Sequence, residues 1–341
     1  MTLKQKTDTV WQFIITISDV AGHITEGSEG DAHASALGQT LYQNSEAVVP
    51  MLPPALSEMA LSLRPNETHM GISLFCTWNT ATKKLTVEEF QETIFTNNAS
   101  YTYDTVYKAT EFPLSVLQEI ASYLHGSPTS DSHEWVAECM ILYNKQVARK
   151  LLEHKVGLLR THKPADAERL KILTALHPDL QALAFEAAKY EPTNTNQIHA
   201  GLGSVPYCHA SSPIRRYADL VNQRHLKAIL KGSPLSPTPL SVAEHLNQIQ
   251  KKFRAYERSL FFLEQLLDVP TGQVEGIVVK STEEKTKVYI PQWKQTIRIE
   301  GIYSIGEKLK IDYYVDLQKP HWDKRVVFRV RTASDSSQEI S

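Results

Sequence analysis

The sequence has little of several features that would place it in a special class of protein. Its three cysteines, Cys76, Cys139 and Cys208, are far apart and lack metal-ligand spacing. They exclude a disulfide scaffold and favour buried thiols in a reducing compartment. No apolar run approaches the roughly 18 residues of a membrane span. Residues 1–10 are too polar for a signal peptide. We therefore predict a cytoplasmic protein without membrane contact.

An excess of positive charge is also missing. Lysine and arginine number 36 against 38 aspartates and glutamates, which leaves a net charge of −2. Any path for nucleic acid must therefore be a local stripe of cations. The 341 residues, 42% of them hydrophobic, are ample for a sizeable core. They fit one large domain with a small one, or two to three ordinary domains.

The stretch from Tyr207 to Leu230 carries the clearest structural signals. Ser212 can cap a helix, Pro213 fits its first position, and Gly232 followed by Pro234 ends it. We predict a helix that begins at Pro213 and turns one face to the core. The apolar residues of that face are Ile214, Tyr217, Leu220, Val221, Leu226 and Ile229.

Two arginines, Arg215 and Arg216, fall in the predicted first turn of this helix. A cation at a helix N-terminus costs about 0.3–1 kcal/mol unless an anion joins it. Free backbone N–H groups and two forked donors together would form a phosphate site. Alternatively, one of the arginines pairs with Asp219 as a surface ion pair. Both interpretations are open at this point.

The chain contains His-Ala-Gly-Leu-Gly at 199–203, then Tyr207, His209, and Ser-Ser-Pro-Ile-Arg-Arg-Tyr-Ala-Asp-Leu at 211–220. This series of motifs closely resembles the signature of the RNB exoribonucleases, the family of ribonuclease II and ribonuclease R. Three further blocks agree with the family at 48–65, 101–106 and 156–164. The resemblance implies an enzyme that hydrolyses single-stranded RNA from the 3′ end to nucleotides. It also implies a divalent metal, Mg²⁺ by expectation, held by a cluster of aspartates.

The resemblance assigns roles to individual residues. Arg215 would clamp the phosphate next to the scissile bond, and Tyr103 would contact the RNA beside it. Tyr42 would stack on a base, an interaction of about 1–3 kcal/mol, and Glu257 would hold an inner nucleotide. The alternatives are a core position for Tyr42 and a solvated ion-pair face for Glu257. The remaining proposed RNA contacts are Arg216, Tyr207, His209 and Ser212.

Apolar periodicity predicts the elements of an α+β core, which the resemblance describes as a mixed sheet with surrounding helices. Strands are predicted at 11–19, 69–78 and 84–95. Helices are predicted at 29–38, 113–124, 133–144, 165–176, 179–189 and 241–267. This RNB-type core would occupy residues 1–268.

A boundary is predicted at Val269-Pro-Thr-Gly. Short β-rich runs follow at 273–280, 286–291, 295–300, 307–315 and 324–331. Such a series suggests a small five-stranded OB-type barrel over 269–331. By resemblance this barrel is an S1-like RNA-binding domain, for which Tyr289, Trp293 and Tyr303 are candidate aromatic contacts. Residues 332–341 form a polar tail that we predict to be disordered.

The metal-binding cluster that the resemblance implies, roughly Asp-x-Asp-Asp-Ala, would fall at or before Met1. Asp19 and Asp31 stand at two other acidic positions of the family, and Asp8 is the only acid upstream of Asp19. We therefore expect an N-terminally truncated chain that has no metal ligands and lacks cold-shock domains. An incomplete copy, a pseudoenzyme, and a chain that receives carboxylates from a partner all stay open. We expect a monomer whose partner is single-stranded RNA, with no small-molecule cofactor.

Overall fold

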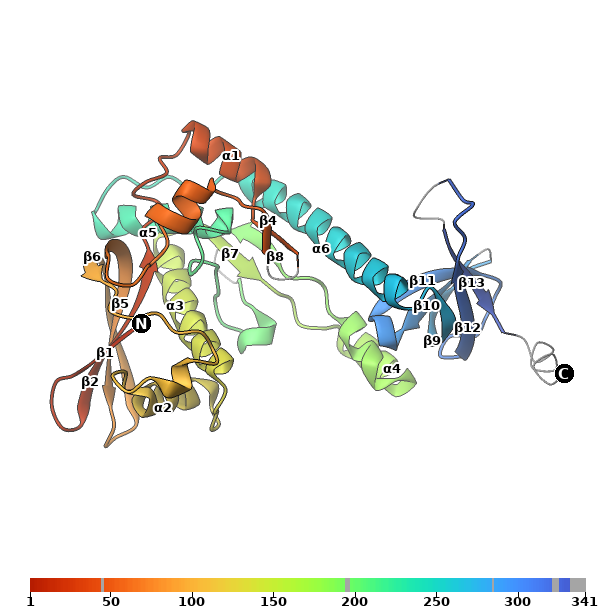
Figure 1. Ribbon diagram of the computed structural model, residues 1–341, viewed down its shortest axis with the longest axis horizontal. Coiled ribbons are helices and arrows are strands. Elements are labelled where there is room, and N and C mark those ends of the chain that lie inside the picture. The colour runs from red at the N-terminus through yellow and green to blue at the C-terminus, as the bar shows by residue number, and fades with distance from the viewer. Residues whose placement is uncertain (44–45, 194–196, 284, 321–324, 332–341) are drawn as a thin grey trace. The chain divides into compact units, whose positions relative to one another are not determined.

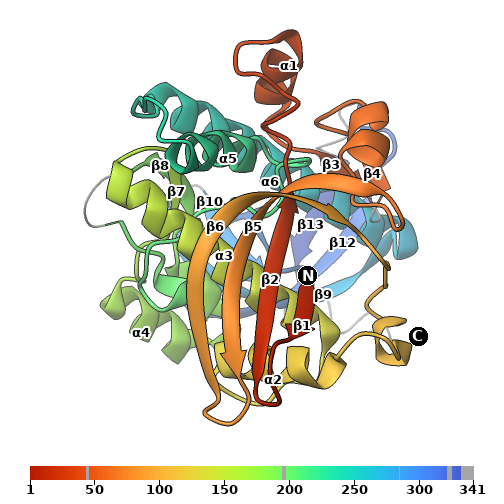
Figure 2. The ribbon, with the colours of Figure 1, turned by 90° about the vertical axis from the view of Figure 1, so that its left-hand side faces the viewer.

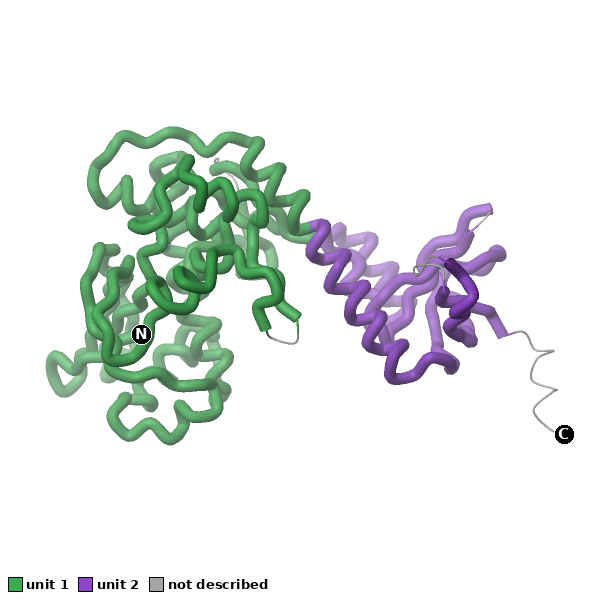
Figure 3. Tube along the Cα trace, turned by 45° about the horizontal axis from the view of Figure 1, so that its top comes forward, with its two compact units in different colours: residues 1–163, 187–250 green, residues 164–186, 251–341 purple. Residues whose placement is uncertain are grey.

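The computed structural model describes residues 1–43, 46–193, 197–283, 285–320 and 325–331 (Figure 1). The chain forms two compact units: Met1–Lys163 with Ala187–Gln250, and Pro164–Glu186 with Lys251–Ser341 (Figure 3). Because the division falls inside one continuous helix, α6 (Leu240–Asp268), the units do not follow the boundary predicted at residue 269. The predicted disordered tail lies outside the described residues.

The first unit contains a four-stranded sheet in the order β1-β2-β5-β6, which Figure 2 shows side by side. The strands are β1 (Thr2–Gln5), β2 (Val10–Ser18), β5 (Thr68–Asn79) and β6 (Lys84–Thr96). The three predicted strands are confirmed, and β1 was not foreseen. Every pair is antiparallel, so the prediction of a mixed sheet is wrong. The physical reason is that the hairpins β1–β2 and β5–β6 make two of the three pairings, and antiparallel strands need no crossover helix.

One face of this sheet is buried because apolar residues alternate along β2. Phe13, Ile15 and Ile17 lie opposite Cys76, Leu74 and Ile72, respectively, and all six are buried. Helices α2 (Leu114–His125) and α3 (Ser132–His154) contribute to the same core. The three cysteines are free and buried, as predicted. Burial raises the pKa of both Cys76 and Cys139 to about 12.

A second core in this unit surrounds α5 (Tyr217–Leu230). Residues of α1 (Glu29–Leu37), the short helix η1 (Ala55–Ala60), β7 (Leu158–Thr161) and β8 (Lys189–Pro192) also belong to this core. Between α1 and η1, the strands β3 (Leu41–Gln43) and β4 (Glu46–Val49) pair with each other. The helix predicted over 179–189 is wrong. Residues Pro178–Ala184 form a 3₁₀ helix, η3, and the chain then extends into β8. Pairing with β7 and burial of Tyr190 override the local helical pattern.

The second unit contains a curled five-stranded antiparallel sheet in the order β11-β10-β9-β12-β13. The strands are β9 (Thr271–Ser281), β10 (Lys285–Ile290), β11 (Gln295–Glu300), β12 (Lys308–Val315) and β13 (Val326–Val330). All five predicted runs are confirmed. The edge strands β11 and β13 also contact each other, as in a small barrel. Helix α4 (Ala167–Leu176) and η3 complete this unit together with the second part of α6.

Two of the aromatic residues proposed to contact RNA from this sheet are core residues. Trp293 is 2% exposed and Tyr289 is 6% exposed. The Trp293 ring lies against Phe262 of α6 and Tyr313 of β12, with ring centroids 5.2 and 5.0 Å away. A small barrel needs large side chains to fill its interior, so these rings cannot stack on a ligand. Tyr303 is half-buried.

None of the helices within the described ranges is both long and apolar enough to cross a membrane.

Candidate functional site

The backbone around Arg215 is held from two sides. This segment belongs to the signature loop, which we define as residues 207–216. Arg215 N–H donates to the carbonyl oxygen of Ser212 at 3.1 Å, and Thr40 N–H donates to the carbonyl oxygen of Arg215 at 3.0 Å. The Arg215 side chain is exposed and makes no hydrogen bond or ion pair with the described part of the chain. An unpaired fork on a fixed backbone can bind an anion.

Helix α5 begins at Tyr217, so the prediction of a start at Pro213 with Ser212 as the cap is wrong. Residues 212–216 form a turn, and Arg216 takes the N-cap position with an extended backbone. The backbone N–H of Ser212 donates to Asp219 Oδ1 at 2.8 Å. This bond holds the loop against the first turn of α5, where the negative charge of Asp219 also suits the helix dipole.

Arg216 and Asp219 form an ion pair at 2.8 Å. Asp219 is 0% exposed, so the pair is buried rather than on the surface. Burial by itself would lower the pKa of Arg216, but the adjacent Asp219 carboxylate outweighs it and the pKa is raised. The two neighbouring arginines therefore differ: Arg216 is neutralised inside the protein, and Arg215 remains available.

Tyr207 and His209 are half-buried, and each makes a hydrogen bond with a side chain outside the loop. Asn144 Nδ2 donates to the hydroxyl of Tyr207 at 2.9 Å, and His209 Nδ1 lies 2.8 Å from the hydroxyl of Tyr190. Burial, and then the nearby charge of Arg216, lowers the pKa of His209 well below its usual value. His209 is therefore neutral at pH 7 and offers no charge to a phosphate.

Two buried asparagines, to which the sequence analysis assigned no role, position the signature loop. Asn144 on α3 accepts from Ala210 N–H at 3.0 Å. Asn222 on α5 donates to the carbonyl oxygen of His209 and accepts from Leu158 N–H, at 2.9 and 2.7 Å. Both lie next to apolar residues on helix faces that point into a core. The sequence could have pointed to these two asparagines, because each is a single amide among apolar residues on a predicted helix. A buried amide needs hydrogen-bond partners, and here the partners are backbone groups of the loop.

Tyr42 and Tyr103 are both exposed, at 41% and 44%, so the alternative of a core position for Tyr42 is wrong. Tyr42 lies on β3, two residues beyond the Thr40 N–H that binds Arg215. The ring of Tyr103 stacks on His133 with centroids 3.6 Å apart and planes at 18°. His133 at the start of α3 was not foreseen, and it adds a second ring to that stacking surface.

Glu257 lies on α6, in the second compact unit. Its side chain is exposed and makes no ion pair with a described residue. The alternative of a surface ion-pair face is therefore not observed. Glu257 lines a cavity of about 370 Å³ with Arg254, Arg258 and Phe261.

The acidic residues at family positions do not fit a divalent metal. Asp19 pairs with the ammonium group of Lys227 and accepts from Gly22 N–H. Asp31 pairs with Arg224 at 2.7 Å. Both carboxylates are thus already occupied by cations from α5. The residues that the structure describes include no group of three or more His, Cys, Asp or Glu side chains that could hold a metal.

Comparison with known proteins identifies the family. The profile of the RNB domain matches residues 1–116 and 109–232, which is more than half of the chain. The chain therefore belongs to the RNB family, as the motifs predicted. Ribonucleases of this family generally depend on a divalent metal.

Among individual proteins, ribonuclease R of Chlamydia trachomatis is 26% identical over 316 residues, covering 72% of this chain and 44% of that protein. Ribonuclease R of Helicobacter pylori is 26% identical over 346 residues, covering 78% and 53%, respectively. The chain thus spans about half of the length of these relatives.

Solved structures confirm the α+β fold with its small β-domain. RNase R of Mycoplasma genitalium, in complex with ribose-methylated single-stranded RNA, superposes with a TM-score of 0.74 at 17% identity. That match covers 96% of this chain and 68% of the other. Yeast Ssd1, a pseudonuclease, superposes with a TM-score of 0.66 at 16% identity, covering 91% and 49%. At these identities the likeness is one of fold.

Proposed function

We propose that this chain binds single-stranded RNA at the signature loop. We further propose that it hydrolyses the RNA from the 3′ end to nucleotides when metal-ligating carboxylates are supplied from outside the described residues. The observation that carries this proposal is the exposed, unpaired guanidinium of Arg215 on a backbone held from two sides. A guanidinium fork carried on such a backbone suits a phosphate group and can stabilise charge that develops on it.

The other proposed contacts are of three kinds. Tyr103, backed by His133, and Tyr42 present exposed rings on which bases can stack. Glu257 has exposed acceptor oxygens for a ribose or a base. The remaining proposed contacts act mainly through the shape of the loop that they hold, and they are Arg216, Tyr207, His209 and Ser212.

Mg²⁺ is the proposed metal, because hydrolysis of a phosphodiester at neutral pH needs an ion that activates water and neutralises the leaving oxygen. Asp19 and Asp31 are not its ligands in this proposal, since each is paired with a cation. We also propose a cytoplasmic monomer with an RNB core over 1–268 and an S1-like domain over 269–331.

A second candidate function is RNA binding without hydrolysis. The two ion pairs of Asp19 and Asp31 favour it, because each of these two carboxylates is already paired with a cation. The three origins considered for the chain differ in their metal-ligating carboxylates. An incomplete enzyme has lost them, a pseudoenzyme lacks them, and a chain completed by a partner receives them from that partner. The RNA-binding loop is retained in all three.

The test uses the full chain, 5′-labelled single-stranded RNA and Mg²⁺, and measures binding and 3′ shortening together. Arg215→Ala is compared with Arg149→Ala, an exposed arginine on α3 that serves as the matched control. Shortening that needs Arg215 and stops with a chelator supports the exoribonuclease. Binding that needs Arg215 but never leads to cleavage supports the second candidate. Absence of binding by the unaltered chain contradicts both.

A further inference from the structure

Three cations lie side by side on neighbouring strands of the five-stranded sheet. Lys287 on β10 lies directly opposite Lys280 on β9 and Arg298 on β11. We call these three residues the basic row, and all three side chains are exposed. Like charges directly opposite each other on paired strands are destabilising. The arrangement therefore works against folding of the sheet.

Other charged positions of the same sheet follow the opposite rule. Lys285 lies opposite Glu300, and Lys310 lies opposite Glu275. Complementary pairs of this kind stabilise a sheet. The basic row, in contrast, makes no hydrogen bond or ion pair with any residue that the structure describes. Carboxylates from outside the chain would relieve its repulsion in the way that Glu300 and Glu275 do for their lysines.

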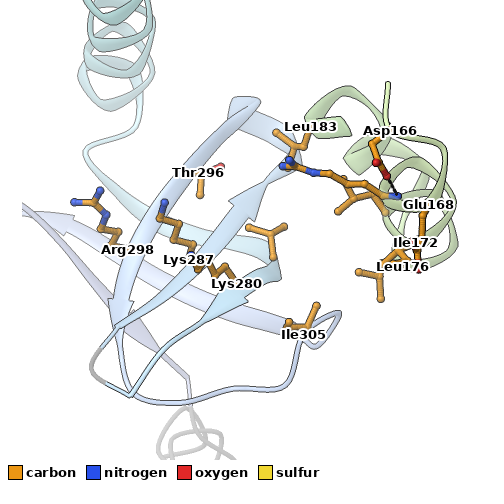
Figure 4. Close-up of a pocket in the computed structure, with 13 residues that line it drawn as sticks. Asp166, Glu168, Ile172, Leu176, Leu183, Lys280, Lys287, Thr296, Arg298 and Ile305 are labelled. Carbon is orange, nitrogen blue, oxygen red and sulfur yellow. Dashed lines mark hydrogen bonds between the residues drawn. The ribbon is translucent and has the colours of Figure 1, made fainter. Parts of the chain in front are cut away.

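The basic row lines one wall of a cavity of about 970 Å³ that lies wholly within the second unit. The opposite wall is formed by α4 and η3 (Figure 4). The side chains that line this helical wall are mainly aliphatic, and they include Ile172, Leu176 and Leu183. Leu173 of α4 packs with Ile277 and Tyr289 of the sheet in one buried cluster. This shared core holds the two walls together.

The aliphatic side of the cavity also lacks a cover. Ile172 of α4 and Ile305, from the loop between β11 and β12, both line the cavity and are both exposed. Burial of such side chains against a partner is favourable, because it removes apolar surface from water. The two walls therefore make different demands: carboxylates on one side and aliphatic side chains on the other.

The lining favours a protein partner over a nucleic acid. None of the described residues that line the cavity is aromatic, whereas unpaired bases bind proteins largely by stacking on aromatic rings. Asp166 and Glu168 also line the cavity, and their charges repel a phosphate backbone. Aliphatic side chains, in contrast, pack closely against the aliphatic side chains of another protein.

We propose that this cavity binds an acidic, amphipathic α-helix of a partner protein, with its carboxylates on the basic row and its aliphatic stripe on the helical wall. Carboxylates three or four residues apart on one helix are separated by about 4.5–6 Å along its axis. Cations on adjacent strands are about 4.8 Å apart, so the two spacings match. Arg169 adds a fourth cation to the lining, against the two carboxylates of Asp166 and Glu168. A helix laid in an apolar groove is a recurring mode of protein recognition.

The test measures binding of a fluorescein-labelled peptide to the full chain by fluorescence anisotropy. The peptide has about 20 residues, enough to form a helix in water, with leucines on one stripe and glutamates on the adjacent one. Lys287→Ala/Arg298→Ala should weaken its binding about 2–30-fold at low salt, the effect of losing two exposed ion pairs. Lys251→Ala/Lys252→Ala removes two exposed cations of α6 outside the cavity and should leave binding unchanged.

A second set of variants tests the aliphatic side and the charge pairing. Ile305→Ser should weaken binding about 5–20-fold, because the peptide covers a side chain that is 60% exposed in the free chain. Ile302→Ser, in the same loop but outside the cavity, is the matched control at 70% exposure. Lys287→Glu/Arg298→Glu should lose the glutamate peptide and bind one with lysines in its place. A purely structural role of the basic row would not produce this exchange.

The remaining outcomes overturn the proposal. One is absence of peptide binding by the unaltered chain, and another is equal binding of a peptide of the same composition whose stripes are scrambled. A third is displacement of the peptide by single-stranded RNA whose own binding falls by the same factor in Lys287→Ala/Arg298→Ala, since the cavity would then take nucleic acid. Peptide binding is measured without RNA, so a failure here leaves the proposed function standing.

Discussion

The signature loop and the basic row use positive charge in opposite ways. In the loop, Arg216 is buried and neutralised by Asp219, and only Arg215 is left exposed. In the row, Lys280, Lys287 and Arg298 are all exposed and lie beside one another. The comparison teaches that a cation's partner, more than its residue type, separates a structural role from a binding role.

Removing the partner of the buried arginine should have the largest effect on stability. Asp219→Ala leaves Arg216 as a buried charge without its partner and removes the acceptor of Ser212 N–H. We expect a loss of about 3–5 kcal/mol in the free energy of unfolding. Urea denaturation followed by circular dichroism measures it. Asp312→Ala is the control: this half-buried carboxylate on β12 of the other unit accepts one hydrogen bond from Gln273 Nε2, and its loss should cost no more than about 0.5–1.5 kcal/mol. Equal effects of the two changes would contradict the buried-pair interpretation.

Alanine variants of the two arginines should differ in what they change, RNA affinity or stability. Arg215→Ala should leave stability nearly unchanged but remove a charge-assisted contact to RNA of about 1.5–3 kcal/mol, or roughly 10–150-fold in affinity. Arg216→Ala should instead lower stability, because it leaves the Asp219 carboxylate buried and unpaired. Fluorescence anisotropy and denaturation on the same samples test both statements. A common loss of stability in the two variants would show that Arg215 is structural after all.

The signature loop should also make the stability of the protein depend on pH, through His209. Burial, and then Arg216, lowers the pKa of His209 well below its ordinary 6.5. The unfolded chain therefore takes up a proton near pH 6.5 while the folded chain does not, and stability is lost as the pH falls below that value. The slope from this group is at most about 1.4 kcal/mol per pH unit. Unfolding free energies measured between pH 7.5 and 5, with His209→Gln as the comparison, should show a flatter profile for the variant.

The smallest effect belongs to the basic row. Lys287→Ala removes repulsion from Lys280 and Arg298, so stability should rise by about 0.2–1 kcal/mol. Lys310→Ala is the matched control, because this lysine lies opposite Glu275 and its removal should lower stability slightly. Thermal unfolding at low salt measures the difference, and added salt should reduce it. A loss of stability in Lys287→Ala would mean that the row has partners within the fold.

Local patterns were sufficient to predict most of the secondary structure. Period-two alternation predicted β2, β5, β6 and the five strands of the second unit, because side chains of a strand alternate between the two faces of its sheet. Local signals failed where a distant residue competes with them. Helix α5 starts at Tyr217, and Asp219 in its first turn accepts from Ser212 N–H and so stabilises the turn that precedes the helix. Residues 185–189 leave the predicted helix because the chain extends into β8, which pairs with β7.

Motifs and periodicity along the chain were enough to predict the family, the order of the elements and the identity of the loop. The folded structure was needed to show which of two consecutive arginines is available, that Asp19 and Asp31 are paired with cations, and that Trp293 is interior. It also brought Lys280, Lys287 and Arg298 into one row. The physical reason is that pairing, burial and cross-strand register are properties of residues brought together by folding, and no local pattern records them.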